Sequence, residues 1–201
     1  MGAMKKYVVA LTGASGSIYG LRLIEELIRA KAFIYFIASP TGEKVMAYET
    51  GFSLTGPNVK KQEILQKKFR SKKIEYVDST DQFSIIASGS VSYDAMIVVP
   101  CSVNTIGCVS TGVAQNVLHR AAAVCLKERR PLIIVPREAP VSLITLRGLT
   151  TLSEAGAIIL PAMPAFYTKP KTLDDVVNFV VGRVLDQLKI PHNLYPRWKS
   201  G

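Results

Sequence analysis

The sequence predicts an α/β fold in which helices cover both faces of a parallel sheet. Short apolar, β-branched runs alternate along the chain with longer stretches that carry apolar residues at helical spacing. Two of these runs, Met96–Val99 and Leu132–Val135, are apolar throughout and are each followed by a proline. Such runs are typical of strands buried on both faces. We therefore expect a doubly wound sheet whose ligands bind at the carboxyl ends of its strands.

Length and composition favour one domain over residues 1–201, with flexible ends at residues 1–4 and about 199–201. No apolar run reaches the roughly 18 residues of a membrane span. Because Thr12 and Gly13 interrupt the first apolar run, we interpret it as a strand and not as a signal peptide. Three cysteines without metal-ligand spacing indicate buried thiols in a reducing cytoplasm.

The formal net charge of +10 is compatible with anionic small ligands or with nucleic acid. Part of this charge lies between Lys60 and Lys73, where Ile64, Leu65 and Phe69 form a helical stripe. That pattern favours a solvated amphipathic helix. No motif for reading a nucleic-acid groove accompanies it, so we expect no nucleic-acid partner.

Besides the helix between Lys60 and Lys73, the first half of the chain predicts three strands, two helices and two small-residue loops. The strands are Tyr7–Leu11, Phe33–Ala38 and the shorter Ile74–Val77. One helix follows the TGASGS loop and runs to about Ala30, with an inner face of Ile18, Leu21, Ile24, Leu27 and Ile28. The next helix begins at Pro40, a favoured first-turn residue, and carries Val45, Met46 and Glu49. The second loop follows Ile85-Ile86.

The second half predicts a strand at Met96–Val99, a polar turn at Cys101–Thr105 and a helix from Asn116 to about Lys127. Three further elements follow the strand Leu132–Val135: a helix over Ser142–Ala155, a strand over Ala157–Leu160 and a helix from Thr172 to about Leu188. Thr172 is the expected N-cap of the last helix, with Asp174 and Asp175 in its first turn.

The TGASGS loop stands between a strand and a helix, where backbone N–H groups hold phosphate or flavin. Its glycines, Gly13, Gly16 and Gly20, lack the spacing of the dinucleotide fingerprint. A flavin or another phosphate ligand is therefore favoured over a nicotinamide cofactor.

Arg120 and Lys127 lie seven residues apart on the predicted helix and should point the same way. Two cations on one face suit a phosphate. The alternative is a solvated face in which Lys127, Arg129 and Arg130 complement the helix dipole. Both interpretations stay open at this point.

The motifs together resemble those of the flavin prenyltransferases of the UbiX type, a family formerly described as aromatic acid decarboxylases. The matching segments are TGASGS at 12–17, Ser39, ASGS at 87–90, PCSVNT at 100–105, HRAAAVCLKERRPLIIVPREAP at 119–140, LPAMPAFYTKP at 160–170, VGR at 181–183 and PRW at 196–198. The resemblance implies a flavodoxin-like or Rossmann-like three-layer sandwich with a central parallel sheet, usually assembled as a dodecamer with FMN at subunit interfaces.

The resemblance also implies a metal-independent reaction that joins the dimethylallyl group of dimethylallyl phosphate to N5 and C6 of reduced FMN. The product, prenylated FMN, would pass to a partner decarboxylase, as in ubiquinone biosynthesis. The implied FMN contacts are Gly13, Ala14, Ser15, Ser39, Ser102, Val103, Asn104, Thr105 and Arg137. The implied prenyl phosphate contacts are Ser88, Gly89, Ser90, Arg120, Lys127, Tyr167 and Arg183. The implied catalytic set is Glu138, Ser15, Glu49, Lys127 and Trp198.

Two other functions are weighed against this one. The first is an FMN-dependent cysteine-type decarboxylase, whose histidine base would follow the first strand, whereas the histidines here are His119 and His192. The second is a non-catalytic FMN carrier, in which the phosphate-binding arginines would have no use.

Overall fold

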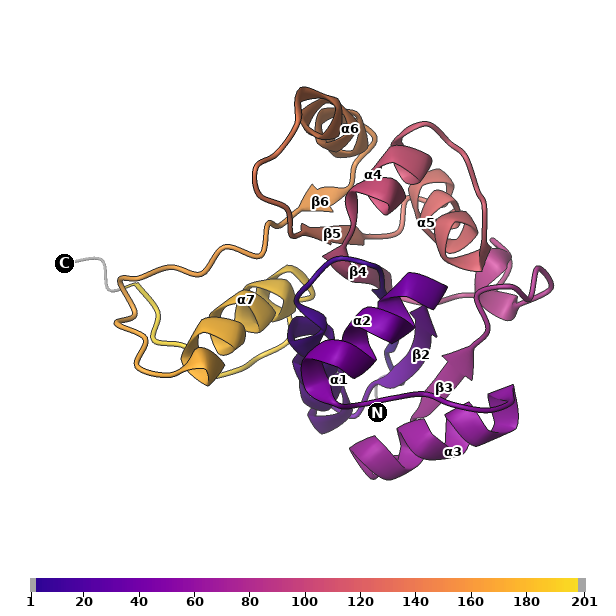
Figure 1. The fold of residues 1–201 in the computed structure, drawn as a ribbon, viewed down its shortest axis with the longest axis horizontal. Coiled ribbons are helices and arrows are strands. Elements are labelled where there is room, and N and C mark those ends of the chain that lie inside the picture. The colour runs from indigo at the N-terminus through magenta and orange to yellow at the C-terminus, as the bar shows by residue number, and fades with distance from the viewer. Residues whose placement is uncertain (1–2, 199–201) are drawn as a thin grey trace.

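The computed structural model describes residues 3–198; residues 1–2 of the flexible end expected at 1–4, and the flexible end expected at about 199–201, lie outside the described residues. A six-stranded sheet forms its centre, in the order β3-β2-β1-β4-β5-β6, and every strand pair is parallel (Figure 1). The strands are β1 Lys6–Leu11, β2 Phe33–Ala38, β3 Ile74–Val77, β4 Ala95–Cys101, β5 Leu132–Pro136 and β6 Ile158–Ile159. The helices are α1 Ser17–Arg29, α2 Pro40–Thr50, α3 Asn58–Phe69, α4 Val103–Ser110, α5 Val117–Lys127, α6 Leu143–Glu154 and α7 Leu173–Gln187, with a 3-10 turn at Ile85–Ala87.

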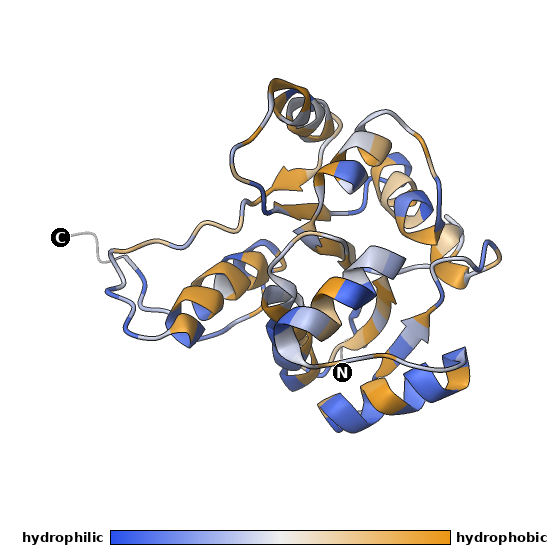
Figure 2. Cartoon of the chain, viewed as in Figure 1, coloured by the Kyte–Doolittle hydropathy of each residue, from blue (hydrophilic) through white to orange (hydrophobic). Residues whose placement is uncertain are grey.

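Alternation of side chains along the strands gives the sheet two apolar faces. In β1, Val9 and Leu11 belong to the core under α1 and α7, whereas Val8 and Ala10 belong to the core under α4 and α5. Figure 2 shows β5 and β6 in hydrophobic colours, whereas the edge strand β3 is partly hydrophilic. The predicted three-layer α/β sandwich is confirmed.

Strand β1 lies between β2 and β4, so the chain winds first to one side of β1 and then to the other. The full order is that of the Rossmann fold, and without the short edge strand β3 it is the flavodoxin-like one; the switch point lies between β1 and β4 in both. Thr12 joins the two strands there. Its hydroxyl donates to the Pro100 carbonyl at 2.8 Å and accepts from the Ser102 N–H at 2.7 Å.

One sequence prediction about the helices was wrong and another was incomplete. The segment after β4 is not only a polar turn, because Val103–Ser110 forms helix α4. The residues predicted for the inner face of α1 do pack in or against the core, Ile18 and Ile28 being partly buried, but the prediction omitted Leu23, which is fully buried. A helix pressed against both a sheet and a second helix buries a wider arc than one apolar stripe predicts, and α1 contacts both β1 and α7.

Helix α3 matches the expected solvated helix, since Leu65 is its one buried residue and the rest of it is mainly hydrophilic (Figure 2). Between residues 3 and 198, no helix is long and apolar enough to cross a membrane. Helix α6 instead presents apolar side chains to solvent: Leu143 is 61% exposed and Ile144 is 82% exposed.

Candidate active site

Predicted FMN residues gather at the carboxyl edge of the sheet. Leu11 pairs with Ala38 across β1 and β2, and Cys101 pairs with Pro136 across β4 and β5. The segments that follow these four strand ends are therefore neighbours. They carry Gly13, Ala14, Ser15, Ser39, Ser102, Val103, Asn104, Thr105, Arg137 and Glu138.

Two serines in this cluster begin helices. The Ser39 hydroxyl accepts from the Gly42 N–H at 3.0 Å and caps α2, and the Ser102 hydroxyl accepts from the Thr105 N–H at 3.4 Å and caps α4. The first turns of both helices thus face the carboxyl edge of the sheet. Backbone N–H groups in a first turn have no partner within the helix and are suited to an anion.

Arg137 links the end of β5 to the glycine loop, because its Nε donates to the Ser15 carbonyl at 3.1 Å. The carboxylate of Glu138 accepts from the Ala139 N–H at 3.0 Å. Both side chains are exposed, so each is open to a ligand at this edge.

Glu49 occupies the N-terminus of α1. Its carboxylate accepts from the Gly16 N–H at 3.0 Å and from the Ser17 N–H at 2.9 Å. Burial opposes ionisation of Glu49, but hydrogen bonds from the Ser15 hydroxyl and from these two N–H groups outweigh it and lower its pKa. An ionised side chain of this chain therefore takes the place at α1 that the sequence offered to a ligand phosphate.

A cleft of about 820 Å³ opens beside this cap, between α1, α2 and α7. Ser15, Gly16 and Glu49 line one end of it, and Leu173 and Asn178 of α7 line another part. The cleft brings Ser15 and Glu49 to one surface, as the resemblance implies.

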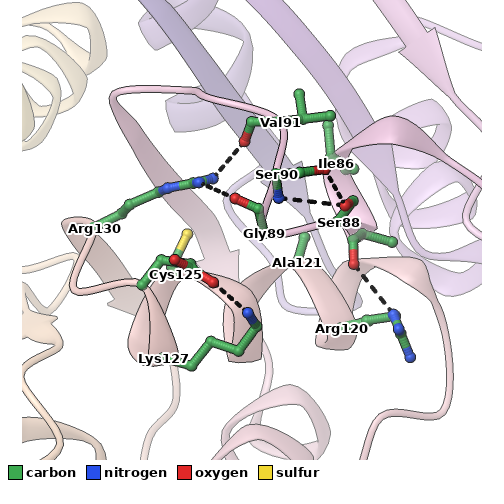
Figure 3. A network of polar contacts seen from close by, with 12 residues as sticks. Ile86, Ser88, Gly89, Ser90, Val91, Arg120, Ala121, Cys125, Lys127 and Arg130 are labelled. Atoms are coloured by element: carbon green, nitrogen blue, oxygen red, sulfur yellow. Dashed lines mark hydrogen bonds and ion pairs between the residues drawn. The ribbon is translucent and has the colours of Figure 1, made fainter.

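A second cavity of about 580 Å³ lies between the 3-10 turn and α5, and Ser88, Gly89, Arg120 and Lys127 line it. The prediction that Arg120 and Lys127 share a helix face is confirmed. Figure 3 shows Arg120 donating from Nε to the Ala87 carbonyl, at 3.2 Å, and Lys127 paired with Glu128. Ser90 is not among the lining residues, but its hydroxyl lies 2.8 Å from that of Ser88.

Sequence reasoning missed the role of Arg130, which does not line this cavity but holds a loop at its edge. Arg130 lies beyond the end of α5 and donates to the carbonyls of Gly89 and Val91 at 2.6 and 2.7 Å (Figure 3). Its guanidinium also stacks over the Tyr93 ring, 4.7 Å from the centroid. Arg130 therefore fixes the loop that carries Ser88–Ser90, and it does not serve as a free cation at the helix end. The sequence did offer one signal: Arg130 lies three residues beyond Lys127, the last residue of the predicted helix, so its side chain need not follow the helix face.

The remaining predicted residues lie on α7 and the segments beside it. Tyr167 packs edge-on against Trp198 at a ring distance of 4.9 Å and against Phe179 of α7 at 6.0 Å. Arg183 is half exposed and pairs with Asp186 at 3.1 Å. Trp198 is 70% exposed, so one face of this aromatic group is open.

One chain does not bring these groups together. The 3-10 turn with α5 and the α7 region lie toward opposite ends of the molecule, with the switch point between them (Figure 1). The two cavities share no lining residue. Within residues 3–198, no three side chains of the metal-binding types lie close enough together to hold a metal ion.

A doubly wound sheet with hydroxyls and helix N-termini at its switch point defines a class of α/β proteins that bind phosphate-bearing cofactors. The Flavoprotein family model matches residues 2–185. A flavin prenyltransferase UbiX from Pseudomonas aeruginosa is 42% identical over 200 residues, which cover 98% of this chain and 96% of the relative. The chain belongs to the flavin prenyltransferases of the UbiX type.

Two solved structures of UbiX-type proteins are also similar to this chain. A structure of AnUbiX in complex with FMN and dimethylallyl pyrophosphate is 32% identical, with a TM-score of 0.89, and covers 99% of this chain and 100% of that one. A dodecameric FMN-dependent UbiX-like decarboxylase from Escherichia coli is 36% identical, with a TM-score of 0.86, and covers 97% of this chain and 100% of that one.

Proposed function

We propose that this chain transfers the dimethylallyl group of dimethylallyl phosphate to N5 and then C6 of reduced FMN. The observation that carries the proposal is the pairing of two sites within a family of flavin prenyltransferases: a flavin-type sheet edge and a separate cavity lined by Arg120 and Lys127. The edge suits a bound flavin and the cavity suits the phosphate of the prenyl donor.

FMN fits the donor set at the sheet edge. Since Glu49 fills the N-terminus of α1, the phosphate of FMN is assigned to the first turns of α2 and α4, around Ser39 and Ser102–Thr105. Arg137 and the Gly13–Ser15 loop hold the ring, because Arg137 already contacts the loop at Ser15. Reduced FMN supplies the two nucleophilic ring positions.

The donor needs charge at its phosphate and π-faces at its allyl group. Cleavage of the allylic C–O bond leaves the electron pair on the phosphate, and Arg120, Lys127 and Arg183 stabilise that charge. The open faces of Tyr167 and Trp198 stabilise the carbocation. Bonding at N5 would release the N5 proton to the departed phosphate. Closure of the ring would then place a proton from that phosphate on the double bond of the N5-bound allyl group and remove the proton of C6, for which Glu138 is the acceptor at the sheet edge.

The separation of the groups within one chain supports a homo-oligomer in which a neighbouring copy supplies the Arg120–Lys127 cavity. We propose a dodecamer, like the Escherichia coli structure. The exposed apolar side chains of α6 fit an interface between copies. Prenylated FMN is then passed to a decarboxylase that consumes it.

The alternatives have less support. A cysteine-type decarboxylase needs a histidine near the glycine loop, but His119 is buried in α5 and His192 lies in the tail after α7. Burial also lowers the pKa of His119. A non-catalytic FMN carrier gives the cations of the second cavity no role.

The direct test is an anaerobic incubation of the protein with reduced FMN and dimethylallyl phosphate, read by mass spectrometry of the flavin. We expect a flavin heavier by one dimethylallyl unit. Glu138→Gln should still bind FMN but form the ringed product about 100-fold more slowly, the usual contribution of general acid–base catalysis. A parent protein that leaves the flavin unmodified with both the phosphate and the diphosphate donor contradicts the proposal.

Co-expression of two variants tests the shared site. Lys127→Ala and Glu138→Gln each damage every site when expressed alone. If each site takes Lys127 from one copy and Glu138 from another, mixed oligomers contain sites with both residues intact and recover about a quarter of the parent activity. A mixture no more active than the better single variant means that both residues act within one copy.

A further inference from the structure

Asp186, in the last turn of α7, is the centre of a polar cluster that joins α7 to the C-terminal tail. Its Oδ2 accepts from the Tyr195 hydroxyl at 2.5 Å and pairs with Arg183 at 3.1 Å. Its Oδ1 pairs with Arg197 at 2.7 Å and accepts from His192 Nε2 at 3.1 Å. Arg183 comes from α7 itself, and the other three come from the tail.

The histidine of this cluster is held in one tautomer. The Leu194 N–H donates to His192 Nδ1 at 3.2 Å, so Nε2 carries the proton that faces Asp186. The His192 side chain is 2% exposed. Burial opposes ionisation of Asp186, but the hydrogen bonds from Tyr195, Arg197 and His192 outweigh it and lower its pKa. Asp186 is therefore a carboxylate shared by two guanidinium groups.

The tail approaches α7 closely at Gly182. A Cβ at residue 182 would lie 2.6 Å from the Tyr195 ring and 2.7 Å from His192 Cε1. A side chain there would push the tail away from the helix. The glycine of the VGR motif thus serves the docking of the tail.

Docking of the tail sets the place of Trp198. Tyr195 packs on Phe179 at a ring distance of 4.9 Å, Phe179 contacts Tyr167, and Tyr167 contacts Trp198. Trp198 is 70% exposed. It has little other packing to hold it, and Arg197, the residue before it, is bound to Asp186.

We propose that Asp186 is a positioning residue for the prenyl donor: it orients Arg183 and docks the tail so that Trp198 stands against Tyr167. The inference rests on the proposed function, in which Arg183, Tyr167 and Trp198 contact the donor. The charges agree with it. Two guanidinium groups share one carboxylate, so one positive charge remains uncompensated and is available to a phosphate.

Asp186→Asn tests the proposal because it keeps the size of the side chain and removes its charge. The KM for dimethylallyl phosphate should rise about tenfold, the value of one charge-assisted contact, with a smaller change in kcat. The dissociation constant of FMN should stay at the parent value, which also shows that the variant folds. Glu63→Gln, an exposed carboxylate on the solvated helix α3, is the control with the same change in net charge.

The single tryptophan gives a second readout that does not depend on turnover. In Asp186→Asn, Trp198 should be quenched more readily by acrylamide and show lower fluorescence anisotropy than in the parent protein. Gly182→Ala should produce the same two changes, since it displaces the tail by steric contact. If Asp186→Asn fails to fold, Gly182→Ala and Tyr195→Phe decide the question.

An unchanged KM in the folded variants overturns the proposal, whatever the fluorescence does. An altered KM with unchanged Trp198 signals overturns the part that concerns the tail. If the parent protein itself transfers nothing from the donor, the proposed function fails and the donor role of Asp186 fails with it. The fluorescence of Trp198 still decides, in that event, whether Asp186 docks the tail.

Discussion

Replacement of Glu49 by glutamine should test its role as the cap of helix α1. The parent carboxylate accepts from the N–H groups of Gly16 and Ser17 at the positive end of α1. A glutamine at position 49 can accept from one of these N–H groups with its amide oxygen, but its NH2 group would then face the other N–H, and two donors cannot form a hydrogen bond. It also loses the interaction of a charge with the helix dipole, about 0.3–1 kcal/mol.

The expected cost follows from these contacts. A hydrogen bond to a charged group contributes about 1.5–3 kcal/mol when it is buried, but solvent screens the largely exposed Glu49 and reduces that value. We expect Glu49→Gln to lower the free energy of unfolding by about 1–2 kcal/mol at neutral pH. For a chain of this size, that corresponds to a melting temperature lower by about 2–8 °C.

The pH dependence gives the decisive check. The folded-state pKa of Glu49 is depressed below its usual 4.5. Its contribution to stability is therefore complete above about pH 4.5 and is lost as the pH falls through the lower folded value. Thermal unfolding of FMN-free protein should give different melting temperatures for parent and variant at pH 7. The two melting temperatures should converge as the pH falls below the folded-state pKa of Glu49. Glu63→Gln, an exposed carboxylate on α3, is the control. Equal stability of parent and Glu49→Gln at pH 7 would refute the capping argument.

Two further substitutions address the other parts of the site. Arg130→Gln should loosen the loop that bears Ser88–Ser90, because it removes the donors to the Gly89 and Val91 carbonyls; steady-state kinetics should show a KM for the prenyl donor raised several-fold, with FMN affinity unchanged. A donor KM equal to that of the parent would show that the loop keeps its shape without Arg130. Thr12→Val removes the hydroxyl that joins β1 to β4 and leaves the Ser102 N–H without its acceptor. Denaturant unfolding should show a loss of about 1–3 kcal/mol, and an unchanged midpoint would mean that another group replaces the hydroxyl.

The strand pattern of the fold could be predicted because each strand carries its own signal. The runs Phe33–Ala38 and Leu132–Val135 are apolar throughout and each is followed closely by a proline, and both are strands in the structure. Helix α4 could not be predicted in the same way. It is eight residues long and contains Gly107 and residues of weak helix propensity. Its start is fixed by the Ser102 cap and its packing against α6, and packing between distant segments leaves no local pattern.

The residue types of the candidate site could be predicted from the sequence, but their hydrogen-bond partners could not. A glycine-rich turn before a helix indicates an anion site, yet the anion at α1 is Glu49, which comes from α2. This contact joins residues more than thirty positions apart. The spacing of the loop does not show which anion, a carboxylate of the chain or a group of a ligand, accepts hydrogen bonds from its N–H groups.

The net charge of +10 does not show which cations can bind a ligand, because many of them are already paired within the chain. Lys61 is paired with Glu43, and Arg130 donates hydrogen bonds to two backbone carbonyls. Lys127 shares its charge with Glu128, whereas Arg120 uses Nε alone in a contact with the neutral Ala87 carbonyl. The Arg120 guanidinium therefore keeps its charge and its two terminal nitrogens for a ligand. A phosphate entering the cavity must compete with Glu128 for Lys127 but meets no such competitor at Arg120 among the contacts of residues 3–198. Arg120 is thus the stronger of the two cations for the proposed donor phosphate, and the Lys127–Glu128 pair adds to binding only when the phosphate displaces the carboxylate.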